Sequence, residues 1–227
     1  MAEIKPNYDT KRKKLAEVIP LAAPFTVYIE QTKYCNFKCF YCIHSTRDEA
    51  DGEFRALGHR MQHMDEAFFE KIIRELKEFP QDGIKRIVFS GLGEPLMNPR
   101  LPDYVRMVVE AGIAGRVEII TNGLLLTPEK SSALVAAGIT NINISVQGLD
   151  AAGYEKTCGV RIDFEQYLEN LRYLFAHKKN TAIYIKAIDA TVPTEEEQKT
   201  FLELFSPMAD RIYIEHLVVM QQQMEDL

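Results

Sequence analysis

Short apolar runs rich in β-branched residues alternate with amphipathic stretches along most of the chain. The runs predict strands, and the stretches between them predict helices because their apolar residues recur at helical spacing. Six strands are predicted, at Phe25–Glu30, Arg86–Ser90, Arg116–Ile120, Asn141–Val146, Ala182–Ala187 and Arg211–Glu215. Strands that alternate with helices are typical of an α/β fold with one parallel sheet and right-handed crossovers.

Amphipathic periodicity locates two of the helices. In residues 65–79 one stripe contains Phe68, Ile72 and Leu76, and we expect this stripe to face the core. A later helix has its apolar stripe at Tyr167, Leu168, Leu171, Leu174 and Phe175. Both stripes predict helices that cover one face of the sheet.

Helix ends carry local signals as well. Thr127 precedes a proline and predicts a helix start, and Thr194 with Glu197 predicts a capping box. Two Ala-Gly-Ile runs place Gly112 and Gly138 where a helix ends and the chain turns into a strand. The repeated corner indicates that one helix-to-strand unit recurs.

Alternation along the predicted strands separates an apolar face from a polar one. We expect the branched residues to face the helices, at Val27, Ile29, Ile142, Ile144, Ile183, Ile185, Ile212 and Ile214. The polar residues would then face inward, at Glu30, Asn143, Ser145, Lys186, Tyr213 and Glu215. A polar interior indicates a cavity that holds ligands. Alternatively, some of these side chains satisfy one another, as Lys186 would with Glu30 or Glu215.

The composition favours an enzyme core over a nucleic-acid-binding or membrane protein. The chain has 227 residues and a net charge of -6, and no apolar run is long enough to span a membrane. Only four cysteines occur, which argues against a disulfide scaffold and favours a reducing, cytoplasmic location. We expect an N-terminal arm (1–23), one core barrel (24–220) and a short tail (221–227).

Three of the four cysteines lie in one short run, at Cys35, Cys39 and Cys42. A structural zinc site normally takes four side chains, and so does a fully ligated cubane of four irons. Three thiolates at this spacing can surround a cubane and leave one iron open. The alternative from the residues alone is a zinc loop that borrows His44 or Cys158 as its fourth ligand.

The run from Cys35 to Cys42, with Tyr41 just before the third cysteine, resembles the signature of the radical S-adenosylmethionine (SAM) superfamily. The resemblance implies a partial (β/α)6 TIM-like barrel of parallel strands, in which the three cysteines hold a [4Fe-4S] cluster and Tyr41 lies beside the cofactor. It also implies that SAM binds the open iron and is cleaved reductively to a 5′-deoxyadenosyl radical, which abstracts hydrogen from a substrate. A flavodoxin or ferredoxin-type protein would supply the electron.

A second segment, Ser90–Leu96, follows the second predicted strand and contains Gly91, Gly93 and Glu94. It resembles the Gly-Gly-Glu element of the same superfamily. The resemblance implies that the loop hydrogen-bonds the ammonium group of SAM through carbonyl groups and the Glu94 carboxylate. Leu92 between the two glycines departs from the family pattern, while the glycines keep the loop free to approach a ligand.

Two later strand ends hold further candidates for cofactor contacts. Asn122 would bond the cofactor or cap a turn. Ser145 resembles the serine that meets the ribose or carboxylate in the family, whereas Gln147 replaces the usual acidic residue. The neutral amide of Gln147 would bind a ribose without the assistance of charge.

The resemblance also implies a cation for the carboxylate of SAM, and Arg161 and Lys186 are the candidates. The segment His216–Val218 resembles the one that brackets the adenine ring. Val218 would contact the ring, while His216 is expected as a buried core residue.

These motifs leave the substrate open. The polar stretch 43–64 is either a substrate lid or an exposed loop, and the motif style is similar to the branch that modifies peptides or carbohydrates. Cys158 is expected as a small apolar filler or, near a substrate, as a hydrogen-atom donor. An iron–sulfur electron carrier or redox sensor that does not cleave SAM is the alternative function.

The family members that this core resembles normally continue into a cysteine-rich (SPASM-type) C-terminal extension. No cysteine follows Cys158, and the sheet edge beside Arg211–Glu215 would be left uncovered. We therefore expect either a minimal enzyme closed by a partner or a fragment of a longer one, in which residues 221–227 begin the extension.

Overall fold

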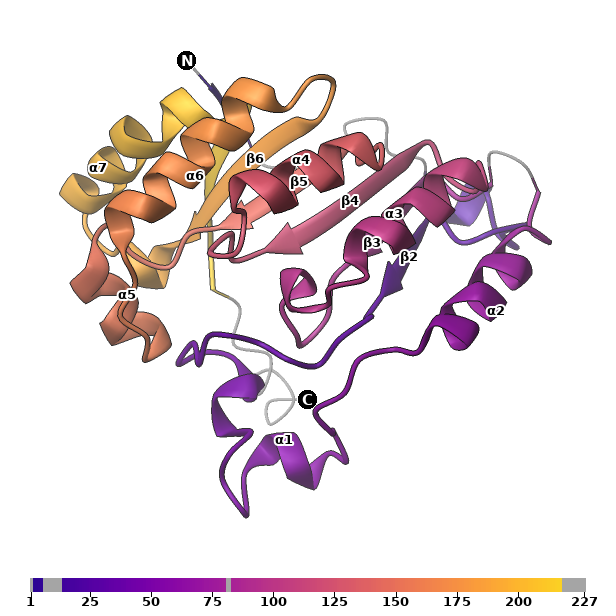
Figure 1. Cartoon of the computed structure of the whole chain (residues 1–227), viewed down its shortest axis with the longest axis horizontal. Coiled ribbons are helices and arrows are strands. Elements are labelled where there is room, and N and C mark those ends of the chain that lie inside the picture. Colours follow the sequence, from indigo (N-terminus) through magenta and orange to yellow (C-terminus); the bar gives the residue numbers. More distant parts are fainter. Residues whose placement is uncertain (1, 6–13, 81–82, 218–227) are drawn as a thin grey trace.

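Seven parallel strands form a single sheet in the computed structural model, which describes residues 2–5, 14–80 and 83–217 (Figure 1). The strands lie in the order β1-β7-β6-β5-β4-β3-β2. Their bounds are β1 Glu3–Ile4, β2 Thr26–Ile29, β3 Arg86–Phe89, β4 Arg116–Thr121, β5 Asn141–Ser145, β6 Ala182–Ile188 and β7 Arg211–Glu215. All six predicted strands are confirmed, with ends that differ by one residue at most.

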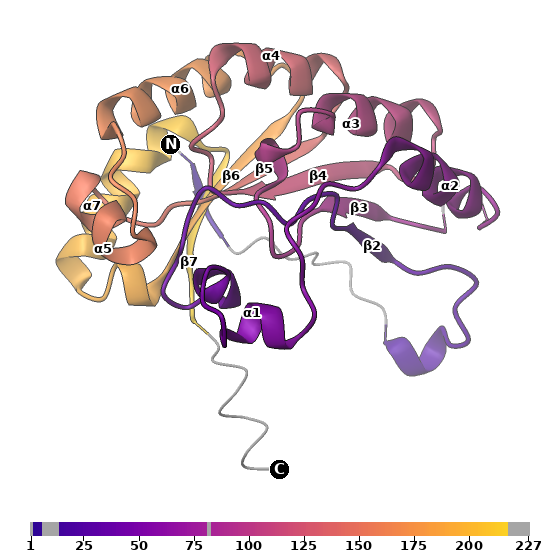
Figure 2. The ribbon, with the colours of Figure 1, turned by 60° about the horizontal axis from the view of Figure 1, so that its bottom comes forward.

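Helices connect the strands, and most of them line the outer side of the curved sheet. They are α1 Glu53–Ala56, α2 Glu66–Leu76, α3 Leu101–Glu110, α4 Pro128–Ala136, α5 Ala151–Cys158, α6 Phe164–His177 and α7 Glu195–Phe205, with short 3-10 turns η1 Leu15–Glu17, η2 Ile43–Thr46, η3 Pro95–Met97, η4 Asp189–Thr191 and η5 Ser206–Met208. Figure 2 shows α2, α3, α4, α6 and α7 arranged in an arc over the strands, while α1 lies on the opposite side. The predicted partial barrel is therefore confirmed.

Branched residues from neighbouring strands form the centre of the core. Ile119, Ile142 and Ile183 stand side by side across β4, β5 and β6, and each is buried. The next row, Ile144 and Ile185, is fully buried as well. Burial of this face removes about 1.5–3 kcal/mol of unfavourable hydration per large side chain, which explains why the strands read as apolar runs.

A buried ion-pair network lies in the interior at the opposite end of the strands from their carboxyl ends. The Glu118 side chain is 2% exposed, and its carboxylate pairs with Arg86 at 3.2 Å and with Arg116 at 2.6 Å. Both arginines are the first residues of their strands. The sequence pattern does not predict this network, because nothing in it distinguishes Glu118 from the apolar residues around it.

The expected helix signals are present. The Thr127 side chain accepts a hydrogen bond from the Lys130 amide, and Thr194 forms the full capping box with Glu197. Gly112 and Gly138 adopt φ of 62° and 88° at the ends of α3 and α4, a conformation that favours glycine. Among the residues with a described structure, no helix has both the length and the apolarity needed to cross a membrane.

Strand β1 corrects the expectation of an uncovered sheet edge. Glu3 and Ile4 pair in parallel with β7, through hydrogen bonds from Glu3 N to Asp210 O at 2.9 Å and from Lys5 N to Ile212 O at 3.2 Å. Arg211 also pairs with the Glu3 carboxylate at 3.1 Å. A two-residue strand has no periodicity for a sequence pattern to detect, so this element was missed.

The buried stripe of α2 also differs from the prediction. Phe69 and Ile73 are buried, whereas Phe68 is 49% exposed. Consecutive apolar pairs in this helix offer two stripes with the same spacing. The ring of Phe69 stacks on Tyr104 of α3, with centroids 4.0 Å apart, and this packing selects the stripe.

We predict that Phe69→Ala lowers the free energy of unfolding by about 3–5 kcal/mol, because it leaves a cavity between α2 and α3. Phe68→Ala, one position earlier in the same helix, is the matched control and is expected to cost less than about 1 kcal/mol. Denaturant unfolding of both variants measures the difference. Equal losses would show that the stripe is assigned incorrectly.

Candidate cofactor site

The three predicted ligand thiols lie on a loop that leaves the carboxyl end of β2. The segment 31–34, here called the stalk, leads into this loop. It pairs with the returning chain through a bridge between Thr32 and His63 and a hydrogen bond from Lys33 N to Gln62 O at 2.9 Å. The stretch 43–64 therefore belongs to a long loop whose two ends are paired, and Figure 1 shows this loop below the sheet. It folds around Phe54, which is 1% exposed, so it is more than an exposed polar loop.

The C-terminal end of α5 holds the middle of the cysteine loop. The Lys38 amide donates to Cys158 O at 2.9 Å, and the Phe40 amide donates to Thr157 O at 3.0 Å. The last carbonyl groups of a helix have no partner within the helix, so the loop satisfies two of them. The same contact places Cys39 Sγ 3.7 Å from Cys158 Sγ.

A second anchor stands behind the loop and involves His44. The ring is buried, with Nε2 2.7 Å from Lys33 O and Nδ1 3.0 Å from the Arg47 guanidinium. Arg47 also donates to Phe37 O at 2.9 Å. Both ring nitrogens are thus engaged within the protein, and this arrangement does not support the alternative in which His44 is a zinc ligand.

The thiols are partly buried, and burial changes how readily they ionise. Burial raises the pKa of Cys35 to about 12 and raises the pKa of Cys42. The hydrogen bond with Cys158 lowers the pKa of Cys39. Thiolates are the ligands that iron–sulfur clusters require, so a cluster bound here would displace protons from Cys35 and Cys42. The three-thiol set fits a soft, positively charged group.

Glu94 lies at the carboxyl ends of β3 and β4 and is buried, with 3% of its surface exposed. Its Oε1 accepts hydrogen bonds from Leu96 N at 3.0 Å and from the Thr121 hydroxyl at 2.5 Å, and its Oε2 accepts from Asn122 N at 2.7 Å. Burial raises the pKa of this carboxyl, and the three hydrogen bonds oppose that shift. The carboxylate therefore joins the Gly91–Glu94 loop to the end of β4.

The two glycines of this loop are required by close neighbours. A Cβ on Gly93 would lie 2.2 Å from Thr32 O and 2.9 Å from Tyr34 O, so the main chain of the stalk leaves no room for a side chain. A Cβ on Gly91 would meet the Glu30 side chain at 2.5 Å. Gly93 thus allows the Gly91–Glu94 loop to pack directly against the stalk of the cysteine loop.

Asn122 connects the same two segments. Its Nδ2 donates to Asn36 Oδ1 at 2.7 Å in the cysteine loop, and its Oδ1 accepts from Leu124 N at 3.0 Å. The predicted turn cap is therefore present. The Nδ2 group of Asn36 lies buried without a hydrogen-bond partner, so this amide donor is unused within the protein.

Tyr41 reaches the end of β5 instead of standing free beside the cysteines. Its hydroxyl donates to Gln147 Oε1 at 2.5 Å, and the Gln147 amide in turn donates to Ser145 O at 3.3 Å. Gln147, which departs from the acidic residue of the family, is thus the partner of the aromatic residue in the cysteine run. Ser145 is the last residue of β5, so it lies at the same end of the sheet as Gln147.

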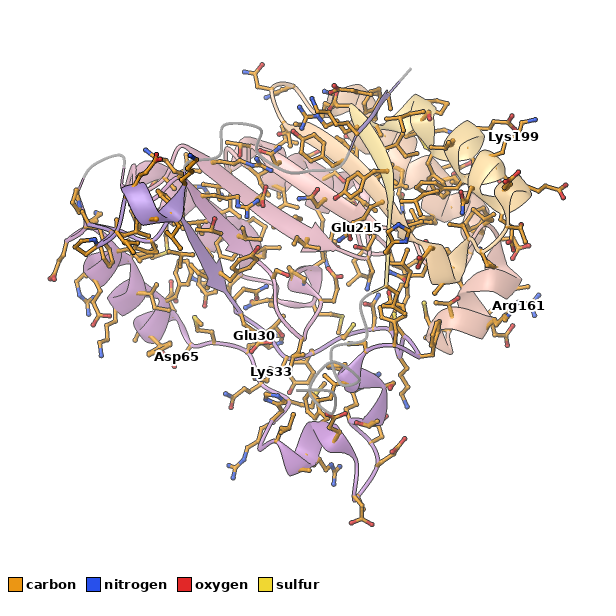
Figure 3. All side chains as sticks on the ribbon, turned by 180° about the vertical axis from the view of Figure 1, so that it is seen from behind. Glu30, Lys33, Asp65, Arg161, Lys199 and Glu215 are labelled. Carbon is orange, nitrogen blue, oxygen red and sulfur yellow. The ribbon has the colours of Figure 1, made fainter. Side chains whose placement is uncertain are left out.

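The two candidate cations have different surroundings. Lys186 is 21% exposed and pairs with Glu215 at 2.6 Å, as one of the alternatives predicted. Arg161 is 78% exposed and lies 3.9 Å from Glu155. Figure 3 shows Arg161 at the outer edge of the molecule, far from Glu30 and Lys33. The structure thus brings Lys186, but not Arg161, to the inner side of the sheet.

The last predicted segment is only partly described. His216 was expected in the core, but its side chain is 93% exposed and pairs with Asp189 at 2.7 Å. The turn η4 places Asp189 at the surface, and this carboxylate also accepts from Leu217 N at 3.0 Å. Val218 lies outside the described residues, so its contact with adenine stays a prediction.

Glu30 was predicted only as an inward polar residue, but it contacts both the Gly91–Glu94 loop and the stalk. Its carboxylate accepts from Leu92 N at 2.6 Å and pairs with Lys33 at 2.9 Å. Figure 3 shows Glu30 and Lys33 together at the end of β2. A cavity of about 210 Å³ opens beside them, lined by Glu30, Thr32, Lys33, Gln62, His63, Met64, Asp65 and Phe68. Glu30 comes directly after the last residue of β2, and this position is the signal in the sequence that could have identified it as a site residue.

Residues 29–204 match the Radical SAM superfamily. The chain belongs to this superfamily. The cofactor-modifying protein of the tungsten-containing aldehyde ferredoxin oxidoreductase of Pyrococcus furiosus is 31% identical over 179 residues, which are 78% of this chain and 46% of that protein. The AdoMet-dependent heme synthase of Nitratidesulfovibrio vulgaris is 28% identical over 183 residues, 81% of this chain and 44% of that protein. This radical SAM chain spans less than half the length of these two relatives.

Solved structures agree on the fold. SuiB of Streptococcus suis bound to S-adenosylmethionine matches 90% of this chain and 44% of its own, with a TM-score of 0.67 at 19% identity. BtrN in complex with AdoMet and 2-DOIA matches 71% of this chain and 56% of its own, with a TM-score of 0.52 at 24% identity. Members of the radical SAM superfamily use a [4Fe-4S] cluster and SAM, and the predicted cofactors agree with this membership.

We predict that Gly93→Ala separates the two motif segments, because the new Cβ meets main-chain atoms that cannot rotate away. The expected cost is about 1–3 kcal/mol in the free energy of unfolding, together with loss of most of the iron after anaerobic reconstitution. Gly115→Ala is the matched control, since nothing lies within 4 Å of a Cβ at that position. Iron analysis and denaturant unfolding measure both effects, and normal iron content in Gly93→Ala would contradict the prediction.

Proposed function

We propose that this chain contains the catalytic core of a radical SAM enzyme, which cleaves SAM reductively to methionine and 5′-deoxyadenosine and takes the hydrogen from a substrate. The main support is the direct packing of the Gly91–Glu94 loop on the stalk of the three-cysteine loop. This packing unites the two segments that the superfamily uses for its cluster and for SAM. Membership of the superfamily supports the enzyme over an electron carrier or sensor.

The residues for the cofactors are assigned by their chemistry. Cys35, Cys39 and Cys42 would hold the cluster, which when bound supplies the electron that splits the sulfonium of SAM. Tyr41 would shield this corner, because its hydroxyl is already fixed by Gln147. The surrounding protein has to exclude water and orient SAM, which suits the partly buried thiols.

The ammonium group of SAM is assigned to the Gly91–Glu94 loop. Glu94 Oε2 accepts one hydrogen bond, from Asn122 N, whereas Oε1 accepts two, so Oε2 keeps the capacity to accept another. Gly91 and Gly93 carry no side chain that would block the approach of a donor to the loop carbonyl groups. Asn122 contributes by holding Asn36 in the cysteine loop.

Lys186 is favoured over Arg161 as the cation for the carboxylate of SAM. Lys186 is mostly buried, and its hydrogen-bonded partner Glu215 would have to release or share it. Arg161 is mostly solvated, which weakens any ion pair that it forms. Ser145 neighbours Lys186 in the parallel register and is assigned to the ribose or the same carboxylate, and Val218 to the adenine.

A peptide or a carbohydrate is proposed as the substrate class. Polar side chains at the carboxyl ends of the outer strands, such as Glu30 and Glu215, suit a substrate with many hydrogen-bonding groups. SuiB, which shares the fold, has been solved bound to its precursor peptide SuiA. We further propose a cytoplasmic location, a flavodoxin or ferredoxin-type reductant, and a core of residues 24–220 to which the arm 1–23 contributes β1.

The reaction is tested with the full chain after anaerobic reconstitution with iron and sulfide. Addition of dithionite and SAM is expected to release 5′-deoxyadenosine, measured by liquid chromatography. Each of Cys35→Ala, Cys39→Ala and Cys42→Ala should lower the yield by more than about 100-fold, because losing a ligand exceeds the effect of losing an outer partner. Lys199→Ala, on the exposed face of α7, is the control. A four-iron cluster that releases no 5′-deoxyadenosine from SAM would identify a carrier or sensor instead.

The role of Glu94 is tested by Glu94→Gln. The amide nitrogen of the variant cannot accept a hydrogen bond, so either the bond from Asn122 N or the bonds from Leu96 N and the Thr121 hydroxyl are lost. We expect a loss of about 1–3 kcal/mol in stability and a rise of about tenfold in the Kd for SAM. Glu195→Gln, at the exposed start of α7, is the control. A destabilised variant with an unchanged Kd would limit Glu94 to holding the two loops together.

A further inference from the structure

Cys158 is the one cysteine of the chain outside the cysteine loop, and it is fully buried at the end of α5. Its Sγ lies 3.7 Å from Sγ of Cys39, within hydrogen-bonding distance for sulfur. The amides of Lys38 and Phe40, on either side of Cys39, donate to the carbonyl groups of Cys158 and Thr157. The main chain therefore holds Cys39 and Cys158 side by side, and their sulfur atoms meet in this arrangement.

The three loop cysteines differ in the partners of their sulfur atoms. Cys35 Sγ accepts from the Phe37 amide at 3.5 Å, which is a local contact within the loop. Cys39 Sγ is the loop sulfur that meets another thiol. A cysteine that ligates a cluster is a thiolate and carries no proton. Once Cys39 is a ligand, the proton shared between the two sulfur atoms can come only from Cys158.

We propose that Cys158 is a positioning residue that donates an S–H···S hydrogen bond to the ligand sulfur of Cys39 and thereby raises the reduction potential of the cluster. The proposal rests on the role as a cluster ligand proposed above for Cys39. A donor to a ligand sulfur stabilises the reduced cluster, which carries more negative charge. Cys158 therefore makes the cluster easier to reduce by a given electron donor.

The midpoint potential of the reconstituted full chain tests this role, followed by electron paramagnetic resonance during a redox titration. Cys158→Ala and Cys158→Val both remove the proton, but the valine keeps the space filled. Both are expected to shift the potential to more negative values. At a fixed applied potential the ratio of reduced to oxidised cluster should fall by up to about tenfold, which corresponds to about 59 mV for one electron. Cys158→Ser keeps a donor and should recover part of the shift.

Three results of this titration would overturn the proposal. Equal potentials in all variants would make Cys158 a filler. A shift in Cys158→Ala that Cys158→Val does not share would identify packing, not the proton, as the cause. Loss of iron in the alanine and valine variants would identify Cys158 as a further ligand.

A measurement on the unmodified protein covers the case in which the variants do not fold. With the cluster bound by three cysteines, Cys158 is the single thiol left in this chain, so its S–H stretching band can be read directly by infrared spectroscopy. The expected band lies below the frequency of an unbonded thiol, and it disappears in heavy water. A band at the unbonded frequency, or no S–H band, would overturn the proposal.

Neither measurement requires SAM to be cleaved, so the two proposals fail separately. A displaced S–H band in a protein that releases no 5′-deoxyadenosine would refute the proposed function and leave the role of Cys158 intact. Release of 5′-deoxyadenosine with an undisplaced band would do the reverse. If the wild-type chain binds no cluster, Cys39 is not a ligand and both proposals fall.

Discussion

The contact between Gly93 and the main chain of the stalk determines where the three thiols lie. Thr32 O and Tyr34 O stand where a side chain of residue 93 would begin, and the Glu94 amide donates to Tyr34 O at 2.8 Å. The segments that meet here follow two different strands, β2 and β3, which are adjacent and parallel. Because parallel strands end at the same edge of a sheet, a small residue is enough to bring their loops into contact.

Three buried or half-buried polar groups then lock this junction. Glu94 ties the loop after β3 to the end of β4, and Asn122 ties the end of β4 to the cysteine loop. Glu30 adds a bond from the end of β2 to Leu92. Each polar group would be costly to bury alone, and each becomes stable because it satisfies another. The protein thus assembles the site from three strands through its own hydrogen bonds.

The strands, the caps and the three cysteines could be predicted because each has a local signal. Periodicity located six strands, and Thr194 with Glu197 identified a capping box that the structure contains. The failures arose where tertiary contacts decide. Phe68 and Phe69 are equivalent in the sequence, and only stacking on Tyr104 distinguishes them. His216 lies at the surface because Asp189, twenty-seven positions earlier, holds it there.

In the candidate site, too, the features with a local sequence signal could be predicted and those set by tertiary contacts could not. Membership of the radical SAM superfamily and its motifs could be predicted from the eight residues Cys35–Cys42 and the loop around Glu94. The partners of those residues could not, because they come from distant segments. Gln147 as the acceptor for Tyr41, Thr121 as a donor to Glu94 and Cys158 as the neighbour of Cys39 are all separated from their partners by 27 positions or more.

The pairing of β1 with β7 has a consequence for the order of events during synthesis. Glu3 and Arg211 are 208 positions apart, yet they form one ion pair at the edge of the sheet. Contacts of such long range form slowly, because a large loop of chain must be ordered first. Glu3 and Ile4 therefore have to wait until β7 has been synthesised before they can pair, so the growing sheet keeps this edge open until then.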